Sequence, residues 1–107
     1  YNRTAIVDAS TVIATIRIGY ADGFSKRLSN GIGFVYINGH RAPVIGSVCM
    51  DMTMVNITHI PNVQEGDSVE IFGLHIGVEE VAKWCATIPY EILTSISQRV
   101  KRVYLNE

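Results

Sequence analysis

One Asn-Gly pair constrains the fold of this chain more than any other feature of its sequence. Asn38-Gly39 lies between two apolar runs, Gly33 to Ile37 and Arg41 to Val48. Asn-Gly is favoured in two-residue hairpin turns, because both residues tolerate the positive φ that such a turn requires. The sequence therefore predicts a β-hairpin, with Pro43 near the start of its second strand.

Further strands are predicted on both sides of this hairpin. Ile13 to Ile18, Met54 to Thr58 and Ser68 to Phe72 are short apolar or alternating runs bounded by turn residues. Gly19 to Gly31 contains glycines and an aspartate that make regular structure hard to continue. We expect a long loop there.

The pattern changes after Gly77. Apolar residues from Val78 to Cys85 recur at helical spacing, and a second such segment opens at Pro89, a residue tolerated in a first helical turn. A closing strand is predicted from Val100 to Leu105. Residues 1–107 are thus expected to form one mainly β domain, a small β-barrel-like fold with two short helices near the C-terminus.

Composition excludes several classes of function. A chain of 107 residues with 48% hydrophobic residues suits one domain with one core, and a formal charge of −1 does not favour nucleic acid or an anionic membrane as a partner. Its apolar stretches are shorter than a bilayer span. Cys49 and Cys85 have no metal-ligand spacing and suggest unpaired thiols, so we expect a cytoplasmic protein without a metal site.

No motif for a nucleotide, zinc or a catalytic serine is present, but several short segments occur in an informative order. They are Ile18-Gly-Tyr-Ala-Asp-Gly23, Leu28-Ser-Asn30, Asn38-Gly39 with Ala42-Pro43-Val44 and Gly46, Cys49-Met-Asp51, and Thr87-Ile-Pro-Tyr-Glu91 with Arg99-Val100. In this order and spacing they resemble the C-terminal domain of bacterial alanine racemases, and the resemblance spans the chain.

The resemblance implies a larger enzyme. In that family an N-terminal (β/α)₈ barrel holds pyridoxal 5'-phosphate on a lysine, and the C-terminal domain reaches into the active site of the partner subunit of a homodimer. Lys26, Lys83 and Lys101 do not match the family's cofactor-lysine motif, so no cofactor is expected on these residues alone. We expect an inactive fragment that supplies groups in trans for interconverting L- and D-alanine in peptidoglycan synthesis.

Three residues match family positions that contact the substrate. The resemblance implies that Tyr1 is the catalytic base for one enantiomer, that Tyr20 lines the inner mouth of the site, and that Met50 donates a backbone N–H to the substrate carboxylate. Two bases on opposite faces of the α-carbon are a direct way to racemise an amino acid. The alternatives are a packing role for Tyr20 and a core position for Met50.

Four further residues match the cofactor site and the entrance. Tyr90 corresponds to a tyrosine near the cofactor phosphate, while Lys26, Asp51 and Ile88 correspond to the entrance corridor. Tyr90 could instead pack on the core, and Asp51 could cap a turn. Many family members have arginine at the positions of Lys26 and Ser47, so the electrostatics of the corridor differ here.

Other hypotheses stay open at this point. The C-terminal sequence is similar to that of racemases fused behind a Mur-type ligase. A serine racemase, another fold-type III pyridoxal-phosphate enzyme, and a β-barrel interaction module without catalytic activity are the competing functions.

Overall fold

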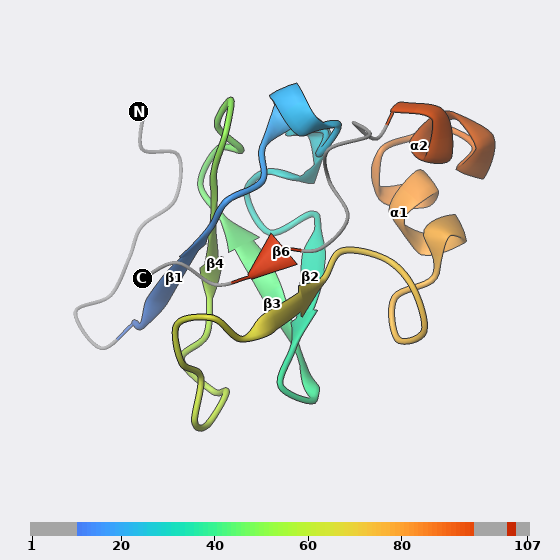
Figure 1. Ribbon diagram of the computed structural model, residues 1–107. Helices are drawn as coiled ribbons and strands as arrows, with labels where there is room; N and C mark the ends of the chain where they lie inside the picture. The colour runs from blue at the N-terminus through green and yellow to red at the C-terminus, as the bar shows by residue number, and fades with distance from the viewer. Residues whose placement is uncertain (1–10, 96–102, 105–107) are drawn as a thin grey trace.

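The chain folds into a curled antiparallel sheet with two short helices at one end (Figure 1). The structure is a computed structural model that describes residues 11–95 and 103–104. Its strands are β1 (Ile13–Ile16), β2 (Phe34–Ile37), β3 (His40–Ile45), β4 (Thr53–Asn56), β5 (Ser68–Glu70) and β6 (Val103–Tyr104), and its helices are α1 (Val78–Trp84) and α2 (Pro89–Ser95). The predicted fold class, mainly β with two late helices, is confirmed. Tyr1 lies outside the described residues.

The hairpin around the Asn-Gly pair is confirmed. Ile37 pairs with His40, and both turn residues have positive φ, 49° at Asn38 and 86° at Gly39. The sheet has the order β1-β4-β3-β2-β5-β6. Strand β3 pairs with β2 as far as Pro43 and with β4 from Val44 onward, so this one strand joins the two halves of the curled sheet.

Several strands end earlier than predicted. Strand β1 stops at Ile16, and β3 stops at Ile45 because Gly46 takes a positive φ of 67° that leaves the extended conformation. The predicted loop from Gly19 to Gly31 contains two 3₁₀ turns, η1 (Tyr20–Asp22) and η2 (Lys26–Leu28). Of the closing strand predicted from Val100 to Leu105, the part that the structure describes is β6.

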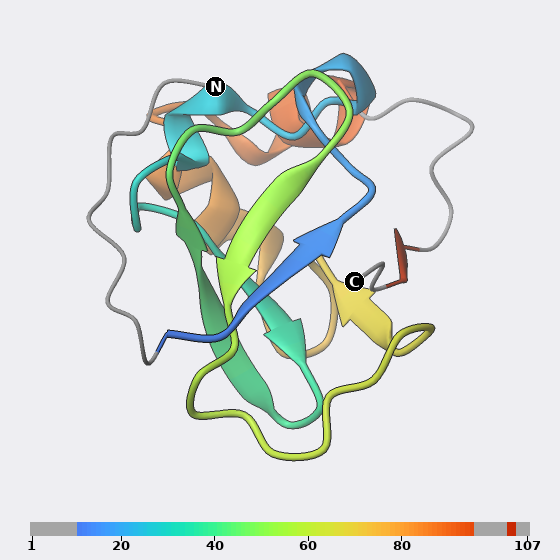
Figure 2. The same cartoon turned by 90° about the vertical axis from the view of Figure 1, so that its left-hand side faces the viewer.

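Alternating burial along the strands builds the core. Strands β1 and β2 each alternate partly buried and buried residues, as expected when one face of a sheet meets the core. The side chains with at most 1% exposure include Ala14, Ile16, Ile18, Val35, Ile37, Ala42, Val44, Val48, Val55 and Ile76. Figure 2 shows that the helices and the two 3₁₀ turns lie together at one end of the sheet. None of the helices described here is long and apolar enough to cross a membrane.

Candidate functional site

Tyr20 and Met50, which are thirty positions apart in the sequence, are brought onto adjacent segments. The backbone N–H of Tyr20 donates to the carbonyl oxygen of Cys49 at 2.9 Å, and Ala21 donates to the carbonyl oxygen of Met50 at 2.9 Å. Both side chains face solvent, with 41% of Tyr20 and 52% of Met50 exposed. This exposure argues against the two packing alternatives, a buried anchor and a core methionine.

Local chemistry explains why Tyr20 lies on a tight turn. Asp22 is 1% exposed, and its Oδ2 accepts the backbone N–H of Gly19 at 3.3 Å. Gly23 then ends the turn with a φ of 99°, which glycine adopts without strain. The aspartate of the Gly-Tyr-Ala-Asp-Gly segment therefore shapes the backbone, and the tyrosine side chain remains on the surface.

Two of the predicted corridor residues lie near this pair. The ammonium group of Lys26 lies 5.4 Å from the centre of the Tyr20 ring, within the range of a cation–π interaction. Asp51 follows Met50 and is exposed, and it makes no hydrogen bond within the part of the chain that the structure describes. The suggested role of Asp51 as a turn cap thus gains no support.

Ile88 and Tyr90 lie on a different part of the domain. They flank the start of α2, where Ala86 has a φ of 54° and turns the chain between the two helices. Ile88 is 61% exposed and Tyr90 is 72% exposed, so neither packs into the core of the described structure. The structure places the predicted residues in two groups, one on the loops around Tyr20 and one at the start of α2.

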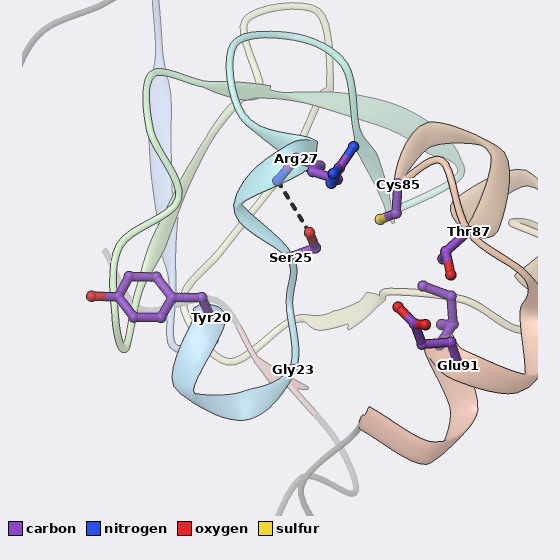
Figure 3. A pocket seen from close by; sticks show the side chains of 8 residues that line it. Tyr20, Gly23, Ser25, Arg27, Cys85, Thr87 and Glu91 are labelled. Atoms are coloured by element: carbon purple, nitrogen blue, oxygen red, sulfur yellow. Dashed lines mark hydrogen bonds between the residues drawn. The ribbon is translucent and has the colours of Figure 1, made fainter.

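A pocket of about 270 Å³ lies between the loop that holds Tyr20 and Arg27 and the segment that runs from Cys85 to Ile92 (Figure 3). Ser25 and Arg27 line one side, while Cys85, Thr87 and Glu91 line the other. Tyr20 also lines this pocket, although Figure 3 shows its ring pointing away from Cys85, Thr87 and Glu91.

No sequence pattern indicated the polar and charged groups around Cys85. Burial raises the pKa of the Cys85 thiol and Glu91 adds to this effect, while Ser25 and Arg27 oppose it. A protonated, buried thiol is a poor nucleophile. Nothing in the sequence pattern links Arg27 to Cys85, because Arg27 lies on η2 and Cys85 follows α1, and only the tertiary fold brings these two distant segments together. Among the described residues, no group of three or more metal-ligating side chains comes together.

Comparison with known proteins identifies the family. Residues 1–104 match the family model described as the alanine racemase C-terminal domain. This chain belongs to that family. The alanine racemase C-terminal domain seen here is 46% identical over 111 residues to an alanine racemase of Geobacter sulfurreducens, with 99% of this chain and 29% of that protein covered. It is 44% identical to alanine racemase 2 of Bacillus subtilis, covering 28% of that protein.

Solved structures of alanine racemases have the same fold as this C-terminal domain. The enzyme from Bartonella henselae, described with covalently bound pyridoxal phosphate, matches with a TM-score of 0.80 and 47% identity over 85% of this chain and 25% of that one. The biosynthetic enzyme from Pseudomonas aeruginosa matches with a TM-score of 0.82 and 38% identity over 91% of this chain and 27% of that one. The chain therefore spans less than a third of the length of these relatives.

Proposed function

We propose that this domain forms one wall of the active site of a pyridoxal-phosphate-dependent alanine racemase, which interconverts L- and D-alanine for peptidoglycan synthesis. The family match supports the reaction. The observation that carries the assignment of the site is the direct backbone contact between the segments of Tyr20 and Met50, because it places two exposed predicted substrate residues side by side.

The residues fit one side of a cofactor site. Tyr90 presents an exposed phenol that could donate a hydrogen bond to a phosphate. Lys26, Lys83 and Lys101 do not match the family's cofactor-lysine motif. We therefore assign the cofactor lysine to another part of a longer protein. When bound, pyridoxal phosphate would withdraw electrons from the α-carbon and so make its proton removable.

Tyr1 is the proposed base on one face of the substrate. Its phenolate oxygen would remove the α-proton of L-alanine or return a proton to that face, while a second base serves the other face. A phenol has an ordinary pKa of about 10, so a cation near Tyr1 is needed to stabilise the phenolate at neutral pH. We propose that the domain offers this group in trans, to the partner subunit of a homodimer.

Met50 is proposed to bind the substrate carboxylate through its backbone N–H. The peptide between Cys49 and Met50 is planar and trans, so its carbonyl oxygen and the Met50 N–H point in opposite directions. Tyr20 holds that carbonyl at 2.9 Å, and the Met50 N–H consequently points away from the Tyr20 segment. In this arrangement, one hydrogen bond orients the proposed donor and fixes the backbone of Tyr20, whose ring would limit the substrate side chain.

The entrance corridor is assigned to Lys26, Asp51 and Ile88. All three side chains are exposed, as residues along a solvent path must be. Lys26 would attract the carboxylate of an incoming amino acid, although a lysine ammonium cannot form the bidentate pair that arginine forms.

The activity is tested on the full-length protein that contains this domain. With pyridoxal phosphate added, it should convert L-alanine to D-alanine, measured by coupled D-amino-acid oxidation, and it should turn over L-serine more slowly. Residues 1–107 alone should give no conversion. Full-length protein that leaves L-alanine unchanged, or residues 1–107 that racemise it alone, would contradict the proposal.

Replacing Tyr1 with phenylalanine tests the proposed base in the full-length enzyme. Tyr1→Phe should lower racemisation at least about 100-fold, the usual contribution of a general base. Exchange of the α-proton of D-alanine with deuterium, which the opposite base serves, should be partly retained and is measured by NMR. Equal retention of racemisation and exchange would remove Tyr1 from the mechanism.

A further inference from the structure

We propose that Gly19 and Thr53 are positioning residues that fix the separation of Tyr20 and Met50, and that this separation sets the largest substrate side chain the site accepts. The effect on substrate choice rests on the proposed function. The geometric part concerns contacts within the described structure and can be tested separately.

Gly19 is required by space. A Cβ atom on this residue would lie 2.2 Å from the carbonyl oxygen of Cys49 and 2.5 Å from that of Met50. Both are backbone atoms, so no side-chain rotation relieves the overlap. The φ of Gly19 is −149°, which any residue adopts. The absence of a side chain therefore lets the backbone before Tyr20 press directly against the segment of Met50.

Thr53 joins the same two segments through a side-chain hydrogen bond. Its side chain is 0% exposed, and its hydroxyl donates to the carbonyl oxygen of Ile18 at 2.6 Å. With the N–H groups of Tyr20 and Ala21, this bond makes three attachments between residues 18–21 and residues 49–53. A buried hydroxyl without its acceptor is costly, so the Thr53 bond resists separation of the segments.

Separation of the segments would change the site in two ways. It would carry the Tyr20 ring away from Met50, and it would free the Cys49 carbonyl, whose bond to Tyr20 orients the Met50 N–H. One methylene more or less on a substrate side chain in an apolar pocket changes the discrimination between two substrates by roughly 10- to 200-fold. A looser contact should therefore weaken the preference for alanine over an amino acid with one more methylene.

Gly19→Ala in the full-length protein is the direct test, with Gly77→Ala as the matched control. Gly77 has a φ of −70° and no atom within 4 Å of an added Cβ, so alanine fits there. Gly19→Ala should lower the kcat/KM ratio of L-alanine to L-2-aminobutyrate at least about fivefold. The amide hydrogens of Tyr20 and Ala21 should exchange with deuterium at least about tenfold faster, because their acceptors move away. Gly77→Ala should change neither quantity.

Thr53→Val and Thr53→Ser keep the test decisive if Gly19→Ala does not fold. Thr53→Val preserves the shape but removes the hydroxyl, so it should speed exchange at Tyr20 and Ala21 and lower the selectivity ratio. Thr53→Ser keeps the hydroxyl and should restore both. Unchanged exchange or unchanged selectivity in folded Gly19→Ala, or in Thr53→Val, would overturn the inference. If the wild-type protein does not racemise alanine, the proposed function fails, while the exchange rates still decide whether the two residues hold these segments together.

Discussion

The carboxylate of Glu70 fixes the loop before α1 by hydrogen bonds to two of its residues. Its Oε2 accepts the backbone N–H groups of His75 and Ile76 at 2.7 Å each, and its Oε1 lies 3.0 Å from Nδ1 of His75. The His75 ring also stacks on Tyr36 at a centroid distance of 4.0 Å. Burial would raise the pKa of Glu70, but these hydrogen bonds outweigh burial and hold it below its ordinary value of 4.5.

Glu70→Gln should therefore destabilise the domain in a pH-dependent way. A depressed folded-state pKa contributes stability that is present above the unfolded pKa of 4.5 and is lost as pH falls through the lower folded value. At pH 7 we expect a loss of about 1 kcal/mol in unfolding free energy, and at pH 3 a smaller difference. Urea denaturation of the full-length protein at both pH values measures it, with the exposed Glu79→Gln as control. An equal loss at both pH values would contradict this role.

Apolar packing and an exposed ion pair attach α1 to the sheet. Arg41 of β3 contacts Glu80 of α1 at 2.7 Å, with 40% and 44% of the two side chains exposed. Each charge favours the ionised form of the other, since the hydrogen bond raises the pKa of Arg41 and lowers that of Glu80. The buried face of α1 presents Val81 and Ala82 to the core, at 4% and 2% exposure. Exposed pairs contribute little to stability, so we expect burial to dominate.

Val81→Ala should cost about 2 to 3 kcal/mol in unfolding free energy, because two buried methyl groups are lost and a cavity remains. Glu80→Gln should lower the melting temperature much less, and 0.5 M sodium chloride should remove its effect, since salt screens exposed pairs. Thermal melting with and without salt compares the two. A larger loss from Glu80→Gln than from Val81→Ala would show that the ion pair attaches the helix.

Six large exposed apolar residues belong to the 3₁₀ turns, the loop between β3 and β4, and the region of α2, segments that lie together at one end of the domain (Figure 2). They are Tyr20, Met50 and Met52 on the loops and Ile88, Tyr90 and Leu93 on and before α2, each between 39% and 72% exposed. Several exposed apolar side chains at one end of a domain indicate an interaction site. Under the proposed function, this end of the domain is covered by the remainder of the racemase.

Hydroxyl-radical footprinting of the full-length protein tests this arrangement. Tyr20, Met50 and Tyr90 should be modified much more slowly than their exposure in the domain implies, because other parts of the assembly shield them. Leu74, which is 91% exposed on the loop held by Glu70, is the internal reference and should remain reactive. Rapid modification of Tyr90 in the assembled protein would contradict the proposal that this end is covered.

The sequence by itself determined the local elements and the family. The hairpin at Asn38-Gly39 and the helices after Gly77 follow from turn chemistry and periodicity, which act within a few residues. The residues around Tyr20 and Met50 could be named through the order of short motifs, and their roles stay predictions. The early stop of β3 at Gly46 was missed, because apolar character alone does not reveal a positive φ.

Only the tertiary structure decided which distant groups meet. The exchange of partners along β3, the pocket between Arg27 and Cys85, and the contact of Gly19 with the Cys49 backbone all join segments that no local pattern links. The preference of a residue for helix or strand depends mainly on its neighbours in the sequence. The contacts named above depend instead on how the sheet curls and where the helices pack against it. For this reason the sequence could indicate Tyr20 and Met50, but only the fold could place them side by side.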